Sequence, residues 1–289
     1  MTEAVAPADP RRMAPVIRTM GRAEIELALD WAAAEGWNPG LDDATPFQVA
    51  DPDGFVVALV DGEPAAMVSV VRYGAEFGFL GLYIAAPASR GRGIGLQVWR
   101  AGLERLAGRT VGLDGVVAQQ ANYRRSGFAY AWPNFRFGGR VAAAPATDLV
   151  AARDLPFDTI EALDRELFPA PRPAFLASWL AMPASRSLGL IEDGRLVGLG
   201  TSRRCRQGCK IGPLYAPSRG AAERLIRGLA GLAAGDELFL DVPEPNAEAM
   251  AMVGDLGLDM RFETARMYRG PAPALPLHRV FGITTFELG

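Results

Sequence analysis

Apolar residues recur at two different spacings along the first half of the chain. Residues 21–37 place apolar side chains three and four positions apart, which is the spacing of an amphipathic helix. Residues 55–60 and 64–73 are rich in strand-forming residues and flank the pair Asp61-Gly62, which tolerates the positive φ angles of a tight turn. The pattern therefore predicts a helix followed by an antiparallel hairpin.

A glycine-rich segment interrupts the next apolar run. Residues 77–87 indicate a strand ending at Pro87, residues 89–95 have the sequence SRGRGIG, and residues 96–108 return to helical spacing. Gly127 follows a shorter helical segment at a C-cap position. The first half is thus predicted to contain strand, helix, three strands, helix, strand, helix and strand, over residues 15–20, 21–37, 55–60, 64–73, 77–87, 96–108, 111–117, 119–127 and 128–140.

The second half repeats this order. Residues 157–168 have helical spacing, residues 187–203 form a hairpin that turns at Asp193-Gly194, and residues 209–231 indicate strand, loop and helix. The paired hairpin turns and the paired strand-to-helix loops are each about 130 residues apart. We therefore predict an internal duplication, with a first domain over residues 14–140, a linker over 141–147 and a second domain over 148–289.

Composition narrows the class of protein. The chain has 289 residues, a formal net charge of -3 and scattered basic residues, so no nucleic-acid partner is predicted. No apolar run approaches the ~20 residues that cross a bilayer, so no membrane partner is predicted either. Residues 1–13 are mixed in charge and lack the apolar core of a secretory signal. We predict a disordered lead-in to a cytoplasmic protein.

Groups that could bind a metal are few. Cys205 and Cys209 are the only cysteines, and His278 is the only histidine. A structural zinc site takes four such ligands, so no metal is predicted. The two cysteines are interpreted as reduced structural thiols on a strand pair or its turn.

The segment SRGRGIG carries the strongest chemical signal. Glycines between a strand and a helix leave backbone N–H groups free to bind an anion, and the helix dipole adds partial positive charge there. Arg90 and Arg92 can add charge-assisted hydrogen bonds to phosphate. The predicted ligand is a diphosphate.

Two other nucleotide-binding motifs fit this segment poorly. A P-loop requires Lys and then Ser or Thr after its last glycine, where this chain has Leu96 and Gln97. A Rossmann fingerprint places G-x-G-x-x-G in the first strand-helix-strand unit, whereas here several strands precede a G-x-G-x-G segment. A kinase or a dehydrogenase is therefore disfavoured.

Residues 15–140 resemble the GNAT N-acetyltransferase superfamily. Its signature is Arg or Gln, two residues, Gly, one residue, and Gly or Ala, which here reads Arg90, Gly91, Arg92, Gly93, Ile94 and Gly95. The segment NYRRSGF at residues 122–128 is similar to a second family motif. The resemblance implies an α/β (α+β) protein of two tandem GNAT folds, each a mixed, mostly antiparallel central sheet flanked by helices.

The resemblance also implies that acetyl-CoA is the cofactor. The backbone of the fourth strand would pair with pantetheine, and the loop amides would hold the pyrophosphate. Tyr123 would lie near the thioester and protonate the leaving thiolate, although it can equally be an ordinary core residue with its hydroxyl at the edge. The residues implied to bind the cofactor are Leu82, Tyr83, Ile84, Arg90, Gly91, Arg92, Gly93, Ile94, Gly95 and Asn122.

The implied reaction is direct attack of an amine on the thioester, with a carboxylate or water as the base. Glu76 lies just ahead of the fourth predicted strand, where the family often has a catalytic carboxylate. The alternative for Glu76 is a solvated charge at the end of a strand. Asp114, which ends the next strand, is a second candidate for the base.

The second half lacks most of the glycine loop, since only Gly220 remains in PLYAPSRGAAERL. We interpret this half as a degenerate GNAT-like domain that does not bind coenzyme A. Asp241, Glu244 and Asn246 follow a strand there, and form either a ligand-binding edge or a polar turn. Trp37, after the first helix, is either a platform for the substrate or a core residue.

Two functions follow from these observations. The first is an N-acetyltransferase that acts on an amine of a small molecule or peptide. The second is a non-catalytic tandem GNAT protein that binds acyl-CoA or a partner. The sequence does not identify the acceptor, and it allows a homodimer without indicating one.

Overall fold

The computed structural model describes residues 14–144 and 147–289. The predicted lead-in at 1–13 lies outside the described residues, as do residues 145–146 of the predicted linker. The first half contains β1 (Val16–Thr19), α1 (Arg22–Ala34), α2 (Ala44–Ala50), β2 (Phe55–Val60), β3 (Glu63–Tyr73), β4 (Phe77–Ala85), α3 (Ile94–Arg105), β5 (Thr110–Val116), α4 (Gln120–Arg125) and β6 (Ala129–Gly139).

The second half has a similar order of elements. It contains β7 (Leu149–Ala151), α5 (Phe157–Leu167), α6 (Pro173–Leu180), β8 (Ser185–Glu192), β9 (Arg195–Arg204), β10 (Cys209–Tyr215), α7 (Arg219–Leu229), β11 (Leu238–Pro243), α8 (Ala247–Asp255), β12 (Asp259–Arg269) and β13 (Val280–Gly282). The helices and strands predicted for the first half are confirmed, and the structure adds α2.

Within the described residues, the strands form one mixed sheet of thirteen strands. Its order is β1-β2-β3-β4-β5-β12-β6-β11-β10-β9-β8-β7, and β13 pairs with β10. Only β4 with β5 and β10 with β11 are parallel pairs, and the other pairs are antiparallel. The predicted class, mixed sheets that are mostly antiparallel and flanked by helices, is confirmed.

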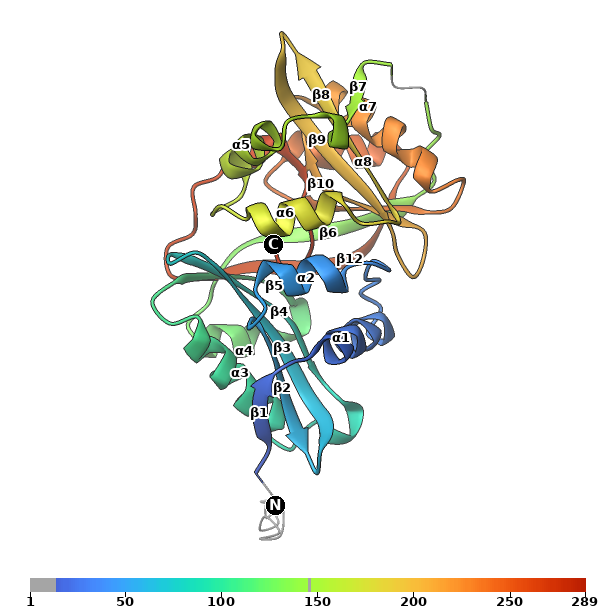
Figure 1. Cartoon of the computed structure of the whole chain (residues 1–289). Helices are drawn as coiled ribbons and strands as arrows, with labels where there is room; N and C mark the ends of the chain where they lie inside the picture. Colours follow the sequence, from blue (N-terminus) through green and yellow to red (C-terminus); the bar gives the residue numbers. More distant parts are fainter. Residues whose placement is uncertain (1–13, 145–146) are drawn as a thin grey trace.

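The two halves exchange their long strands at the centre of this sheet. β12, from the second half, lies between β5 and β6 of the first half. β6, from the first half, pairs on its other edge with β11 of the second. Both strands cross the middle of the molecule in Figure 1. Backbone hydrogen bonds therefore run without a break from one half of the sheet to the other. The domain boundaries at residues 140 and 148 stay predictions, because the sheet itself has no boundary there.

Helices α2 and α6 join the halves on one face of the sheet (Figure 1). The rings of Phe47 on α2 and Trp179 on α6 stack with centroids 6.4 Å apart, and both side chains are fully buried. Burial of one such aromatic side chain stabilises the fold by roughly 2–3 kcal/mol. The two helices have only seven and eight residues, too few to show a clear helical period in the sequence.

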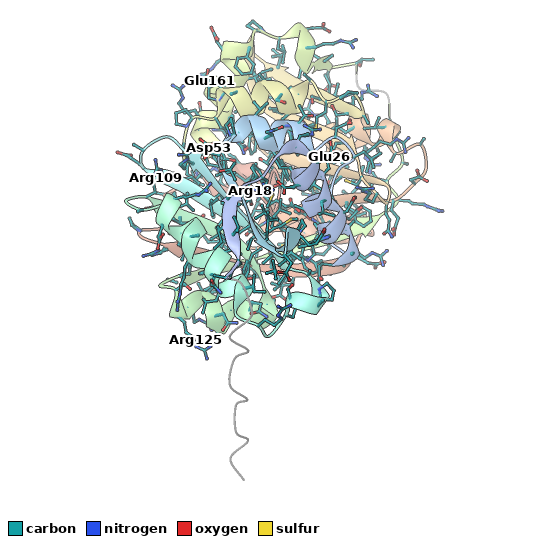
Figure 2. All side chains as sticks on the ribbon, turned by 60° about the horizontal axis from the view of Figure 1, so that its bottom comes forward. Arg18, Glu26, Asp53, Arg109, Arg125 and Glu161 are labelled. Atoms are coloured by element: carbon teal, nitrogen blue, oxygen red, sulfur yellow. The ribbon has the colours of Figure 1, made fainter. Side chains whose placement is uncertain are left out.

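Many charged side chains lie on the outer surface, while others form ion pairs that are buried. Figure 2 shows Arg109, Arg125 and Glu161 at the edge of the molecule. Within residues 14–144 and 147–289, no helix is long and apolar enough to cross a membrane.

Candidate active site

Strands β4 and β5 separate halfway along their length. Their parallel register runs from Phe77 opposite Thr110 to Leu80 opposite Leu113, and no pair follows Leu80. Beyond that point β4 has a bulge against β3, and Leu82 adopts a φ of 44°, which is strained for a side chain other than glycine. The bulge bends β4 away from β5. One backbone edge of β4 is therefore left open to an extended ligand.

A cavity of about 490 Å³ opens at this separation. It is lined by the ends of β4 and β5, by the glycine loop, and by residues of β12 and the C-terminal tail. Leu82, Tyr83 and Ile84, which the family resemblance implied would pair with pantetheine, all line it. The cavity therefore joins a strand edge and the glycine loop in one site.

The glycine loop leads directly into α3. Gly91 and Gly93 have φ angles of 70° and 77°, and Gly93 is the N-cap residue of α3. A Cβ atom at either position would meet nothing within 4 Å, so the space above the loop is open. In the described chain, no N–H group of residues 91–96 donates to a backbone acceptor. These N–H groups can bind a phosphate at the positive end of the helix.

The other residues of the loop have different surroundings. Arg90 lines the cavity, but its guanidinium forms an ion pair with Glu35 and donates to the carbonyl of Ala85 at 3.1 Å. Arg92 points away, toward the carbonyl of Ala88. Ile94 is buried in the core under α3. The backbone, more than the arginine side chains, is thus presented to a phosphate.

Tyr123 reaches the cavity from α4. Its ring stacks on Trp99 with centroids 5.5 Å apart, and the residue is 7% exposed. Burial raises the pKa of Tyr123, and the nearby Tyr83 raises it further. The phenol therefore stays protonated at neutral pH and can donate a proton. Asn122 does not share this position, because its exposed amide bonds to Gln119 at 2.6 Å and to Arg125 at 2.9 Å.

The structure does not bring Glu76 to the cavity. Glu76 is exposed and precedes the first residue of β4, where its carbonyl accepts the N–H of Thr110 at 2.8 Å. Gly81, at the cavity, is five residues further along, which corresponds to about 16 Å of extended strand. Glu76 was predicted next to the correct strand, β4, but it lies at the amino end of that strand. Ligands approach the carboxyl ends of parallel strands.

Asp114 does line the cavity, but its carboxylate is occupied. It accepts two hydrogen bonds from Arg266, at 2.8 and 2.7 Å, and one from Asn134 at 2.6 Å. Burial raises the pKa of Asp114, while the arginine and the amide oppose that shift. This carboxylate holds β12 against β5 and has little capacity left to serve as a base.

Sequence reasoning missed the cavity residues contributed by the second half. Phe262 and Thr264 come from β12, and Phe286 and Glu287 come from the C-terminal tail. Trp37 lines the same cavity. The available signal for Glu287 was a lone acid in the otherwise apolar or uncharged segment FGITTFELG.

The equivalent separation in the second half is filled by the chain itself. β10 and β11 pair only from Cys209 to Ile211, after which β13 pairs with β10 and the N–H of Ile283 donates to the carbonyl of Asp241 at 2.9 Å. Asn246 caps α8 and donates to the carbonyl of Val280 at 3.0 Å, so this side chain serves the fold. A pantetheine arm has no free strand edge there.

A strand edge left open beside a bulge, with a glycine loop at the start of the next helix, defines an acyltransferase of the GNAT class. Two family profiles match the chain. The "Acetyltransferase (GNAT) family" matches residues 22–128, and the "Acetyltransferase (GNAT) domain" matches residues 160–282. The Holothin acyltransferase of Pseudoalteromonas sp. (strain SANK 73390) is 31% identical over 271 residues, 92% of each chain. The chain belongs to the GNAT family of acyltransferases and has two GNAT domains.

Solved structures share the whole architecture. A putative acetyltransferase from Pyrococcus horikoshii covers 99% of both chains with a TM-score of 0.81 and 22% identity. A tandem GNAT protein from the clavulanic acid biosynthesis pathway has a TM-score of 0.62 and 17% identity, and covers 90% of this chain and 100% of its own. At these identities the likeness shows the fold alone.

Proposed function

We propose that this acyltransferase transfers an acetyl group from acetyl-CoA to an amine of a small molecule or peptide. The observation that carries the proposal is the open edge of β4 next to the open glycine loop. The pantetheine arm would pair with the backbone of Leu82, Tyr83 and Ile84, and the loop amides would hold the pyrophosphate. Acetyl-CoA supplies the activated acyl group as a thioester.

The part of the cavity proposed to hold the acceptor favours a compact amine with an apolar body. Its walls include the aromatic rings of Trp37, Phe262 and Phe286. The relative that is 31% identical is named as an acyltransferase for holothin, which makes holothin the first amine to test. A panel of small primary amines and amino acids extends that test.

Tyr123 has the properties of the acid that protonates the departing thiolate. Its burial and its raised pKa keep the phenol protonated at neutral pH, so its O–H group is available to the negative charge that develops on the departing sulfur. Gly115 permits this position, because a Cβ atom there would lie 2.1 Å from the Tyr123 ring.

We expect Tyr123→Phe to lower kcat for acetyl transfer by about 100-fold, because one general acid contributes roughly 10²- to 10⁴-fold. The ring remains stacked on Trp99, so the Kd for acetyl-CoA and the melting temperature should change little. Steady-state assays of thiol release measure the first quantity. The matched control is Tyr130→Phe on the exposed surface. Equal kcat values for wild type and Tyr123→Phe would exclude the acid role.

Gly93→Glu is expected to abolish binding of acetyl-CoA. The new side chain would enter the open space above the loop and place a negative charge where the pyrophosphate binds. Isothermal titration calorimetry should give one site per chain in the wild type and no measurable heat in the variant.

The matched control is Gly194→Glu, in the hairpin turn of the second half. Gly194 has a φ of 74° and open space around its Cβ position, so the backbone strain is the same but the charge lies far from the loop. Binding that survives in both variants, or is lost in both, contradicts the proposed phosphate site. No binding by the wild type contradicts the proposed function.

A further inference from the structure

Glu287 is the least satisfied acidic group of the described chain. It is 2% exposed, it lines the cavity, and both of its carboxylate oxygens lack a hydrogen-bond partner within the described residues. A buried carboxylate without partners is unfavourable by itself, so such a group in a native protein requires an explanation. A ligand group that enters the cavity can supply the missing partner.

The backbone around Glu287 is held firmly in place. Thr285 accepts the N–H groups of Glu287 and Leu288 through its hydroxyl at 3.0 and 2.9 Å. Tyr73, on β3, donates its hydroxyl to the carbonyl of Leu288 at 3.0 Å. β13 anchors the start of the same tail in the second half. The carboxylate is therefore presented from a rigid support.

Glu287 lies at the point where β4 and β5 separate. A Cβ atom on Gly81 would be 2.1 Å from the carbonyl oxygen of Glu287, so the tail touches β4 directly after the last β4–β5 pair at Leu80. The thioester of a donor paired with Leu82 to Ile84 would end near this point. The carboxylate thus lies on the acceptor side of the proposed acyl group.

The arginines that face Glu287 are each paired with an aspartate, although Nη1 of Arg203 has no hydrogen-bond partner within the described residues. On β6 and β11, Arg136 binds Asp241 at 2.6 Å, and on β9 Arg203 binds Asp43 at 2.8 Å. Across the cavity, Asp114 on β5 binds Arg266 on β12 at 2.7 Å.

Two titratable groups near Glu287 lie outside these pairs. Lys210 on β10 is buried, and among the described residues its amine donates one hydrogen bond, to the carbonyl of Trp37 at 3.4 Å. Burial lowers the pKa of Lys210, and it raises the pKa of the nearby Cys205 thiol. The electrostatic partners of both groups include one another, and those of Lys210 include Glu287. Within the described residues no cation forms a hydrogen bond with Glu287, although the charges of Arg136, Arg203 and Lys210 all act on it. Both of its oxygens are therefore open to a ligand group.

We propose that Glu287 is the general base of acyl transfer, which binds the acceptor amine and removes its proton. This inference rests on the proposed function. The amine nitrogen donates its electron pair to the thioester carbonyl carbon, a C–N bond forms, and the C–S bond breaks. The Glu287 carboxylate takes the proton lost by nitrogen, and the departing thiolate takes the proton of Tyr123. Solvent returns a proton to Tyr123 and removes one from Glu287, so each turnover yields an amide and free CoA thiol.

Glu287→Gln tests this role because it removes the basic oxygen without changing the shape. With holothin or an amine from the panel as acceptor, kcat should fall by about 100-fold or more. In the wild type we expect kcat to fall at low pH, and this fall should be absent from the pH profile of Glu287→Gln. The Kd for acetyl-CoA should stay within a factor of two, and Glu287→Asp should recover part of kcat.

The matched control is Glu263→Gln, whose exposed side chain lies on β12 between the two cavity residues Phe262 and Thr264. A purely structural role predicts a lower melting temperature for Glu287→Gln with the pH profile of kcat unchanged, whereas the base role predicts a changed pH profile whatever the melting temperature. If Glu287→Gln keeps the kcat and the pH profile of the wild type, Glu287 is not the general base. Acetyl transfer by the wild type would still support the proposed function in that case.

Discussion

Gly81→Ala is expected to abolish most acyl transfer and to destabilise the fold. The added Cβ atom would lie 2.1 Å from the carbonyl oxygen of Glu287, 2.8 Å from its carbonyl carbon and 2.9 Å from its Cα atom. All three are backbone atoms of a tail held at both ends, so neither side can yield by a change of rotamer. Overpacking of this kind costs about 1–3 kcal/mol of unfolding free energy. A shift of about 1 Å in a catalytic group lowers the rate by about 100-fold.

Chemical denaturation and kcat measured on the same preparations check this prediction. The matched control is Gly78→Ala on the same strand. Its Cβ atom would lie 2.6 Å from a methyl group of Leu106, a flexible side chain at the far end of β4 from the cavity. Gly78→Ala should therefore lose stability with little loss of kcat. If both variants keep wild-type kcat, Glu287 is not held against β4 as the structure describes.

The helices, strands and glycine loop could be predicted because their signals are local. The hairpin turn at Asp61 and the spacing of Gly91, Gly93 and Gly95 each lie within a few consecutive residues. Such patterns report backbone conformation directly, since glycine alone adopts positive φ without strain. The loop's place beside an open strand edge followed from the resemblance to the GNAT family.

The pairing of β6 with β11 and of β5 with β12 has no such local signal. Each half carries strands of similar composition, and which half supplies a neighbour depends on contacts distant in sequence. Glu287 was missed for the same reason. Its role depends on contact with Gly81, on the opposite half of the chain, which no pattern around either residue reveals.

Glu76 shows a different limit of sequence reasoning. Its strand was identified correctly, but a carboxylate at the amino end of β4 and one at the carboxyl end look alike in sequence. Only the register of β4 with β5, which ends at Leu80, shows which end is open. The second half gives a similar example. There β13 pairs with β10 where β10 and β11 separate, and the missing glycines alone did not predict this strand.

Arg172→Met is expected to lower the free energy of unfolding by about 3–5 kcal/mol, the usual cost of removing one partner from a buried ion pair. Arg172 is fully buried, stacks on Phe168 at 3.6 Å and donates to Asp164 at 2.9 and 2.8 Å. It also donates to Thr284 at 2.8 Å and to the carbonyl of Gly289 at 3.3 Å. The variant leaves Asp164 without its cation and releases the tail that carries the proposed base.

The matched control is Arg165→Met on α5, whose exposed ion pair with Glu161 should contribute less than about 0.5 kcal/mol. Urea denaturation measures both variants. Adding Asp164→Leu to Arg172→Met should restore part of the stability, because the lone buried charge is removed. Because the tail would still lack its bonds to Thr284 and Gly289, kcat should stay low in the double variant. Recovery of kcat together with stability would show that Arg172 acts on the core alone and does not position the tail.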